Sequence, residues 1–450
     1  MKLIVQNIML VIFFLSSQNV LGQSLDTISL TLEQAWKMAE QNHPDYQSQL
    51  ISGQITDKQL DEALGKLLPQ ISGTFDVRYN IKRPTTILPG ELVGRPGEDI
   101  PVQFGKFWNN TAGIEISQFV FDATILEDLK ILRLNRQLDD VQAEVSLQNL
   151  KIDAIRSYLQ VLINEARSKE LKNNALALKN TLVLTQAKVD AELLNEIELE
   201  RVENSYQNAL SDIAKSEQAI LLSRQLLNLV LGLPVDQPVV LLDELQVPDD
   251  FETTVAMETI QPVNLTNLPA LRLQILQVSA IEAEMKKQQK ALLPTASLYG
   301  YLGSNGVGDQ PNWFNSSKIR WYGSSYVGLK LNWQFNAFFD NRQIMPQLTL
   351  KMQQAKLQVK GTQNDLMEAI VEAQSNLKSA SEDIRIQQRN YKFAKKELNY
   401  LTIRFQNDLS TAKDLIEAEE TMNAAQAGYW GAYYNFQVAA YELQKAKGEI

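Results

Sequence analysis

The spacing of apolar residues predicts two very long helices, one in each half of the chain. In the first half, apolar residues recur alternately four and three positions apart from Leu134 to Ala166, with one polar interruption. In the second half the same rhythm runs from Leu366 to Phe405, again with one interruption. This is the pattern of a coiled-coil seam. Neither stretch contains proline, so helices of about 60 residues, roughly 90 Å long, are possible.

Each long helix is predicted to turn back on itself. Polar segments follow the helices at 190–195 and 406–411, and returning helices are expected at 195–231 and 411–447. Each half of the chain therefore contains a predicted helical hairpin with a tight, acidic end.

The returning helices begin at recognisable capping sequences. Asn195 is followed three residues later by Glu198, and Thr411 is followed at the same spacing by Asp414. Such pairs form capping boxes, in which a side chain and a carboxylate bind the free amides of a new helix.

Two shorter helices, at 31–66 and 268–292, each end at a Leu-Leu-Pro sequence, after which the apolar period changes to two. Odd positions are apolar or glycine through 71–81, and the same alternation is clear at 327–335. The segments 112–121 and 296–303 alternate less cleanly. Alternation over about 10 residues fits a membrane-spanning β-strand. A soluble antiparallel sheet with one buried face is the alternative, and from alternation alone it is the commoner case.

The surroundings of these strands favour the membrane. Long loops rich in Gly, Pro and Asn, at 82–110 and 304–323, join the paired strands. Aromatic residues bound the strands, as an interfacial girdle requires: Tyr79, Trp108, Phe119, Phe121, Trp313, Trp321, Tyr322, Trp333, Phe338 and Phe339.

The second half of the sequence repeats the first. Leu67-Leu68-Pro69 recurs as Leu292-Leu293-Pro294, about 225 residues later. The repeat predicts a pseudo-symmetric molecule. It divides the chain into a first copy at 23–231 (β-hairpin about 71–121, helical hairpin about 124–231), a connection at 232–263, and a second copy at 264–450 (β-hairpin about 295–335, helical hairpin about 346–447).

The N-terminal segment predicts export from the cytoplasm, and the composition argues against several functions. Residues 1–22, with Lys2 before an apolar core, are predicted to be a secretory signal peptide, because the apolar core is too short to span a membrane as a helix. The chain has no cysteine, one histidine (His43) and a net charge of −10. We therefore expect no catalytic residues, cofactor or metal site, and no nucleic-acid partner. An enzyme is the least favoured class.

Four strands cannot close a barrel, and lipid does not tolerate an open sheet edge. If the strands lie in a membrane, several chains must share one barrel. Two chains give eight strands and a filled interior, whereas three give twelve strands and a lumen.

The sequence resembles the TolC-like outer-membrane efflux proteins over essentially the whole mature chain. The resemblance rests on the duplication, the Leu-Leu-Pro junctions, the strand endings 118–122 and 332–336, and the second hairpin end at 408–418. It implies a mixed α/β membrane protein, mainly α: a homotrimer whose four strands per chain form a twelve-stranded transmembrane barrel and whose coiled-coil hairpins form a periplasmic α-barrel. The resemblance also implies location in the outer membrane of a Gram-negative-type bacterium, contact with its lipid, and docking to a periplasmic adaptor and an inner-membrane pump. The connection 232–263 would lie in a belt around the tunnel.

The same resemblance identifies candidate gate residues. Asp414 and Glu417 match the acidic rings that close the family's periplasmic end, and their spacing places both carboxylates on one helical face. Three copies around an axis would favour cations. The alternative is that both are solvated charges in a first helical turn.

Five further residues are weaker gate candidates. The first is Phe405, which stands where the family's latch uses a tyrosine. Ser410 stands where the latch uses an arginine, so Arg404 and Lys413 are candidates to replace that charge. Glu196 and Glu198 are the acidic counterparts in the first copy.

The predicted function is a passive exit duct for efflux or type I secretion, gated at its helical ends. The alternative is an exported coiled-coil protein with a structural or adhesive role in the envelope.

Overall fold

The structure is a computed structural model, and it describes residues 27–94, 96–243, 245, 263–311, 319–407 and 409–450. The predicted signal peptide, 1–22, lies outside the described residues, as does most of the predicted connection 232–263. The described residues are mainly helical and divide into two compact units. The first unit is Met1–Gln49, Ala143–Leu268 and Asn364–Ile450, and the second is Leu50–Gln142 and Pro269–Gln363. Each unit therefore takes residues from both halves of the sequence.

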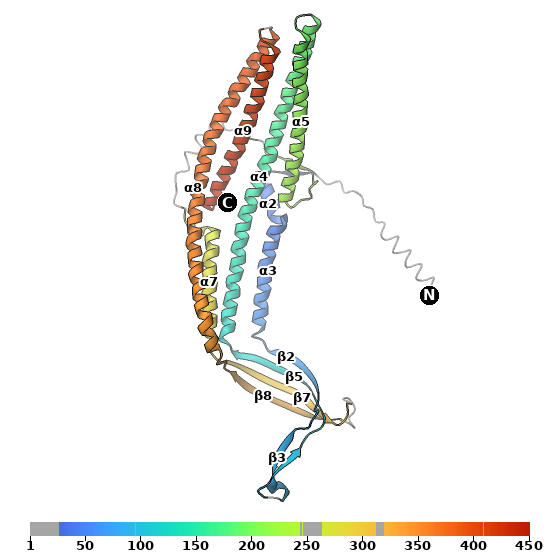
Figure 1. Cartoon of the computed structure of the whole chain (residues 1–450), viewed down its shortest axis with the longest axis vertical. Helices are drawn as coiled ribbons and strands as arrows, with labels where there is room; N and C mark the ends of the chain where they lie inside the picture. The colour runs from blue at the N-terminus through green and yellow to red at the C-terminus, as the bar shows by residue number, and fades with distance from the viewer. Residues whose placement is uncertain (1–26, 95, 244, 246–262, 312–318, 408) are drawn as a thin grey trace, which may run out of the picture. The chain divides into compact units, whose positions relative to one another are not determined.

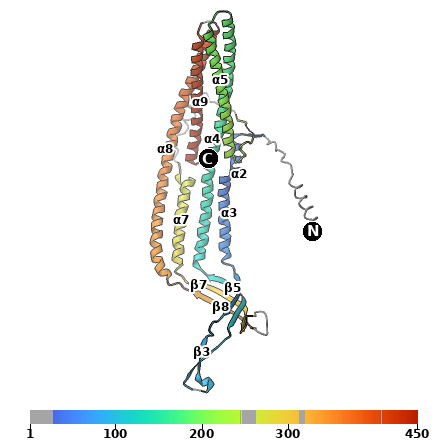
Figure 2. The same cartoon turned by 45° about the vertical axis from the view of Figure 1, so that its right-hand side comes forward.

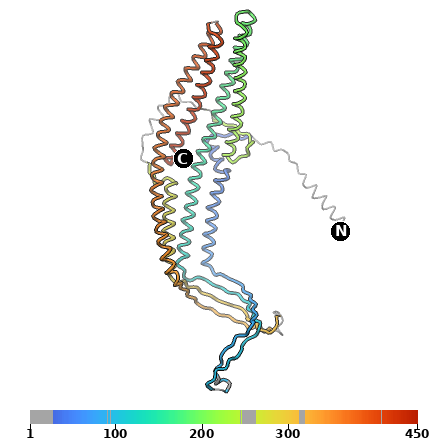
Figure 3. The backbone as a smooth tube through the Cα atoms, viewed as in Figure 1, coloured from blue at the N-terminus to red at the C-terminus, as the bar shows by residue number. Residues whose placement is uncertain are grey.

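The first unit holds two helical hairpins. One is formed by α4 (Ala123–Asp190) and α5 (Glu196–Val230), and the other by α8 (Ala337–Gln406) and α9 (Ala412–Lys447). The parts of α4 up to Gln142 and of α8 up to Gln363 belong to the second unit. Figures 1 and 2 show both hairpins, and Figure 3 traces the backbone turning back at their ends. With 68 residues in α4 and 70 in α8, the two very long helices predicted from apolar spacing are confirmed.

The middle of α4 is buried on two faces rather than one. Ile152 and Ile155 belong to the predicted seam and pack toward α9. Ala154 and Tyr158, which lie off that seam, are equally buried and pack in a second cluster. The Tyr158 hydroxyl donates to Asp243 over 2.8 Å, and burial raises the pKa of this tyrosine. The seam rule alone finds one face because it describes a two-helix contact, whereas α4 contacts several helices.

The helix predicted at 31–66 is two helices. α2 (Leu32–Asn42) ends at His43, whose φ of −65° and ψ of 122° are extended, and α3 (Pro44–Gly65) starts at the next residue. A proline disfavours the helical conformation of the residue before it, which explains the break. Before α2, β1 (Ile28–Leu30) pairs in parallel with β6 (Val239–Leu241). A short 3-10 turn, η2 (Leu265–Asn267), precedes the second copy's helix.

The second unit contains the four predicted strands in one antiparallel sheet. β2 (Gln70–Tyr79), β5 (Trp108–Phe121), β7 (Thr295–Gly308) and β8 (Ile319–Asn332) lie side by side in that order (Figure 1). β5 pairs with β7, so the two sequence copies meet in the middle of the sheet. In this single chain the sheet is open, with β2 and β8 at its edges. α7 (Pro269–Lys290) lies beside the first part of α8 (Figures 1 and 2).

The two faces of the sheet differ in polarity. Register places Ile71 opposite Ile116, and Leu298 opposite Leu329, so apolar side chains from all four strands share one face. The other face carries Ser, Thr, charged residues and three tyrosines: Ser72, Thr74, Asp76, Arg78, Glu115, Ser117, Tyr299, Tyr301, Tyr326 and Lys330.

Three boundaries in this unit differ from the sequence predictions. The predicted loop 82–110 contains a second hairpin, β3 (Thr85–Pro89) and β4 (Asp99–Gln103), joined through the 3-10 turn η1 (Gly90–Val93). The predicted loop 304–323 is shorter, because β7 and β8 extend into it and β8 ends at Asn332 rather than 335.

The extension of β7 and β8 has a packing reason. Gly306 sits against the Trp321 ring of the neighbouring strand, where a Cβ atom would lie 2.9 Å from that ring. From the sequence alone, glycine at this position indicates a loop. Gly306 instead lies within β7, where the absence of a side chain leaves room for the Trp321 ring. In addition α8 starts at Ala337 rather than at 346, with Pro346 inside the helix. None of the helices in the described part of the chain combines the length and hydropathy needed to cross a bilayer.

Candidate gate at the ends of the helical hairpins

The two hairpin ends have the same backbone construction. The amide of Leu193 donates to the carbonyl of Lys188 over 2.9 Å, and the amide of Leu409 donates to the carbonyl of Arg404 over 2.9 Å. This six-residue bond is that of a Schellman turn, which satisfies carbonyls that the end of a helix leaves free. In the first turn Glu192 takes the left-handed φ of 62°. Both turns are therefore tight, as predicted.

The second returning helix has the complete capping box. The Thr411 amide donates to Asp414 Oδ2 over 2.9 Å, and the Asp414 amide donates back to Thr411 Oγ1 over 3.3 Å. The bond from the Thr411 backbone amide holds the pKa of Asp414 below its usual value. Asp414 is therefore charged at neutral pH within the chain.

The first returning helix has half of the predicted box. The Glu198 amide donates to Asn195 Oδ1 over 3.0 Å, but the Glu198 carboxylate does not return a bond to the Asn195 amide. Instead its Oε1 lies 3.8 Å from Arg201, and its Oε2 is buried without a hydrogen bond. The prediction of two equal capping boxes is thus wrong for the first copy, because the longer glutamate side chain packs along the helix. Glu196 is exposed to solvent.

The acidic pair predicted to line a pore is exposed in the single chain. Glu417 is 63% exposed, and Asp414 is exposed as well. Both lie in the first turns of α9, three residues apart and on one face. Lys413 lies on the same surface, 3.5 Å from Glu417. The pair can therefore present two carboxylates per chain to whatever faces the hairpin end.

Arg404 and Phe405, at the end of α8, have different roles. The Arg404 guanidinium donates twice to the carbonyl of Leu409, over 3.1 and 2.7 Å, and so closes its own turn. Phe405 is buried, with 2% of its surface exposed, in a cluster with Val202 and Leu415 that joins the two hairpin ends.

Lys188 is the residue at this site that sequence reasoning missed. Its Nζ donates to the Phe405 carbonyl over 2.9 Å and lies 5.1 Å from the centre of the Phe405 ring. Lys188 is 8% exposed, and an ammonium so buried needs such partners. The available signal was its position at the end of a four-three stripe through Leu178, Thr181 and Thr185. The stripe predicts that position 188 faces the other hairpin.

A second set of contacts joins the hairpins further from their ends. Glu170 on α4 accepts hydrogen bonds from Tyr391 on α8, over 2.8 Å, and from Gln426 and Trp430 on α9, the last over 3.0 Å. Between this carboxylate and the ends, Asn174 donates to the side chain of Asn423. The hairpins are therefore joined in at least two separate places.

Buried in the same region is the carboxyl group of Glu419. It accepts a hydrogen bond from Ser205 on α5, but its Oε2 has no partner. Glu419 is 9% exposed, and burial raises its pKa to about 8. It is therefore mostly protonated at neutral pH.

The described residues combine an open amphipathic sheet with two long helical hairpins, and this fold is similar to those of several solved outer-membrane channels. The fold is similar to that of the outer-membrane channel OprN, with 16% identity over 93% of this chain and 89% of that one, and a TM-score of 0.69. It is similar to CusC, with 16% identity over 96% and 94% of the two chains and a TM-score of 0.68. It is also similar to VceC from Vibrio cholerae, with 13% identity over 93% and 96% and a TM-score of 0.69.

The sequence adds evidence for the family. Residues 263–449, which cover the second copy, match the model of the family described as Outer membrane efflux protein. No match was found among curated proteins. The structural similarities, at these identities, show the fold, and the family match in sequence extends over residues 263–449. The resemblance to the TolC-like family is thus confirmed.

Proposed function

We propose that this chain is one of three identical subunits of an outer-membrane exit duct for efflux or type I secretion. The three sheets together form a twelve-stranded barrel, and the helical hairpins form a tunnel in the periplasm. A periplasmic adaptor and an inner-membrane pump dock to the tunnel and supply the energy, so the duct itself is passive. The connection 232–263 belongs to a belt around the tunnel.

The polarity of the sheet is the observation that carries this proposal. Val327, Leu329 and Leu331 on β8 are 79%, 68% and 67% exposed, and they share their face with apolar residues of the other three strands. An apolar sheet face of this size is exposed in the single chain. Its exposure to water is unfavourable, and its transfer into lipid lowers the free energy. The opposite face, with Asp76, Glu115 and Lys330, suits the wet interior of a barrel.

The open edges of the sheet support assembly from several chains. β2 and β8 present unpaired backbone groups, which lipid does not tolerate. Pairing β8 of one subunit with β2 of the next closes the barrel and removes both edges. Three subunits leave a lumen, whereas two leave an interior filled with side chains.

Two adjacent residues on β5 allow a matched test. Ile114 lies on the apolar face and Glu115 on the polar face. Arginine at a lipid-facing position near the middle of the membrane costs about 2–4 kcal/mol. We expect Ile114→Arg to reduce the trimer recovered from outer membranes strongly, while Glu115→Arg assembles normally and conducts in planar bilayers. Equal recovery of both variants, or a wild-type chain that stays in solution as a monomer without detergent, would overturn the proposal.

The gate belongs to the same proposal. Asp414 and Glu417 from three subunits surround the axis and form a constriction that favours cations, since their carboxylates crowd together. Phe405, held by Lys188, keeps the second hairpin end against the first. Opening is an outward, iris-like movement of the hairpin ends. Arg404, Lys413, Glu196 and Glu198 set the turns and the local charge around this constriction.

The alternative, a structural or adhesive envelope protein, uses the long helices equally well. It predicts that high salt releases the protein from membranes, because no sheet is inserted. The bare apolar face of the sheet favours the duct, which requires detergent for release.

A further inference from the structure

A pocket between three helices of the second unit is not used by the duct mechanism. α3, α4 and α7 line a cavity of about 330 Å³ that is open on one side. This volume is at the small end of the range for ligand sites, about 300–1,000 Å³. Ile125, Ile131 and Leu132 of α4 form an apolar wall. The size fits a polar headgroup rather than a large molecule.

Charges of both signs surround the pocket. Lys66 and Lys287 supply two ammonium groups, and Glu62, Asp128 and Glu284 supply three carboxylates. Lys287 and Asp128 form an ion pair of 2.8 Å, which raises the pKa of Lys287.

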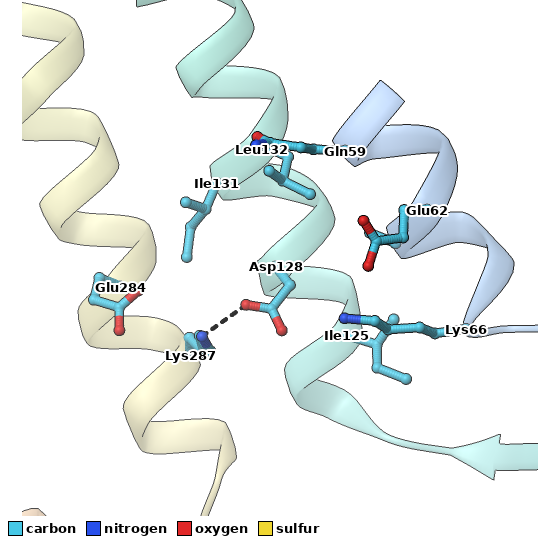
Figure 4. A pocket seen from close by; sticks show the side chains of 10 residues that line it. Gln59, Glu62, Lys66, Ile125, Asp128, Ile131, Leu132, Glu284 and Lys287 are labelled. Carbon is cyan, nitrogen blue, oxygen red and sulfur yellow. Dashed lines mark ion pairs between the residues drawn. The ribbon is translucent and has the colours of Figure 1, made fainter. Parts of the chain in front are cut away.

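Glu62 and Lys66 remain available to a ligand. In Figure 4 their side chains extend from α3 toward Asp128 on α4, and the dashed line marks the pair of Asp128 with Lys287. In the part of the chain that the structure describes, Glu62 and Lys66 have no such ion pair. An occupant with one cationic and one anionic group would satisfy both signs of charge. A simple anion would pair with the ammonium groups only, and a simple cation with the carboxylates only.

The pocket lies next to the ends of the strands. Lys66 precedes the start of β2 at Gln70 by four residues, and Ile125 follows the end of β5 at Phe121 by four. Four residues span at most about 14 Å. If the strands cross the hydrocarbon, the pocket opens at or beside the headgroup layer, which is roughly 5–8 Å deep on each side.

Aromatic side chains mark the same level. Trp333, directly after β8, is 47% exposed and donates from its ring nitrogen to the Leu292 carbonyl over 3.1 Å. Phe121 and Phe335 are 48% and 64% exposed. Such rings collect at membrane–water interfaces.

We propose that the pocket binds the headgroup of a zwitterionic aminophospholipid, phosphatidylethanolamine, from the adjacent leaflet. The phosphate lies between Lys66 and Lys287, and the primary ammonium donates to Glu62 and Glu284. The glycerol lies against Ile125, and the acyl chains follow the apolar face of the sheet. This inference rests on the proposed function, because it requires the strands to be in a membrane.

Lipid retention measures the site directly. The full-length trimer would be exchanged into detergent with phosphatidylethanolamine, phosphatidylcholine or phosphatidylglycerol, and retained lipid counted by native mass spectrometry. We expect at least a tenfold preference for phosphatidylethanolamine. Phosphatidylcholine lacks N–H donors for the carboxylates, and phosphatidylglycerol lacks the cation. Equal retention of the three lipids overturns the inference.

A charge-matched pair of variants locates the binding. Glu62→Gln with Lys66→Gln should abolish the preference. Lys58→Gln with Asp61→Asn removes an exposed ion pair from the same helix, outside the pocket, and should retain it. Equal loss in both variants overturns the assignment to the pocket.

Two further measurements separate the possible failures. Glycerophosphoethanolamine has the same headgroup without acyl chains, and its binding without binding of the lipid would overturn the lipid as occupant. Conductance is recorded from the same preparations in planar bilayers. Channels without lipid preference overturn this inference alone, whereas a chain that neither inserts nor conducts overturns the proposed function as well.

Discussion

The first and second hairpin ends share a backbone but differ in what their side chains bind. Lys188 and Arg404 occupy the same place in the two turns, since each carbonyl accepts the six-residue bond that ends its helix. Lys188 reaches across to Phe405 of the other hairpin, whereas Arg404 binds the Leu409 carbonyl of its own turn. The two turns thus share one backbone geometry, but the first makes the contact between the hairpins and the second closes on itself.

The acidic residues divide in the same way. Asp414 completes a capping box and remains exposed, while Glu198 is half-buried beside Arg201. The second end therefore offers exposed carboxylates in a fixed geometry, and the first end offers a packing surface. This asymmetry favours the second copy for the proposed gate.

The largest effect is expected from Lys188→Met, which keeps an unbranched side chain one atom shorter and removes its ammonium. The Phe405 carbonyl loses its partner, and the hairpin ends separate more readily. We expect trimers in planar bilayers to conduct several-fold more. Arg404→Met is the matched control, because Arg404 binds within its own turn and should change conductance less. A larger increase from Arg404→Met would reverse the assignment of the two ends.

A smaller effect is expected on ion selectivity. Replacing Asp414 by Asn and Glu417 by Gln removes six carboxylates from a trimeric constriction, so preference for cations and block by multivalent cations should weaken. Glu196→Gln with Glu198→Gln removes the same number from the first ends and should leave selectivity nearly unchanged. Reversal potentials in asymmetric salt measure both. Identical changes of reversal potential in the two double variants would show that the first and second hairpin ends contribute equally to ion selectivity.

Apolar periodicity predicted the helices well because it reports burial directly. The predicted seam of α8 is buried or half-buried throughout, from Leu366 to Phe405. The hairpin β3–β4 was missed because its segment is rich in glycine and proline, which usually indicate a loop. The strand extension at Gly306 was missed for the same reason, although this glycine makes room for the Trp321 ring of the neighbouring strand. Lys188 was missed because the four-three stripe indicates which way its side chain faces but not its partner, Phe405, which lies more than 200 residues away.

The third prediction compares Glu419 with Glu203, which is exposed. The two correspond because each lies eight residues after the capping residue of its helix, Thr411 or Asn195. The folded state holds a proton on Glu419 up to about pH 8, whereas the ordinary value for an exposed glutamate is 4.5. Stability should therefore fall as pH rises from about 4.5 to 8, by up to about 1.4 kcal/mol per pH unit.

Glu419→Gln should remove that slope and raise the midpoint of thermal unfolding at pH 8. Glu203→Gln should leave the slope unchanged. Unfolding followed by circular dichroism at several pH values measures both variants. A slope that survives in Glu419→Gln would show that another group carries the pH dependence.

The smallest effect concerns the two caps. Asp414→Ala removes the carboxylate that accepts from the Thr411 amide, whereas Glu198→Ala removes no bond to the Asn195 amide. Loss of a capping bond costs about 0.5–1 kcal/mol, or roughly a two- to fivefold faster amide exchange in the first turn. Hydrogen exchange should therefore accelerate at 411–415 in the first variant and remain unchanged at 195–199 in the second.

Thr411→Ala separates the cap from the proposed gate. It removes the acceptor of the Asp414 amide but keeps both carboxylates of the acidic pair, so exchange should accelerate while cation preference is retained. If Thr411→Ala changed selectivity as much as the loss of the carboxylates does, the geometry of the first turn rather than its charge would control the ions. The acidic pair would then act through the fold of the hairpin end, and the difference between the two copies would be one of helix capping alone.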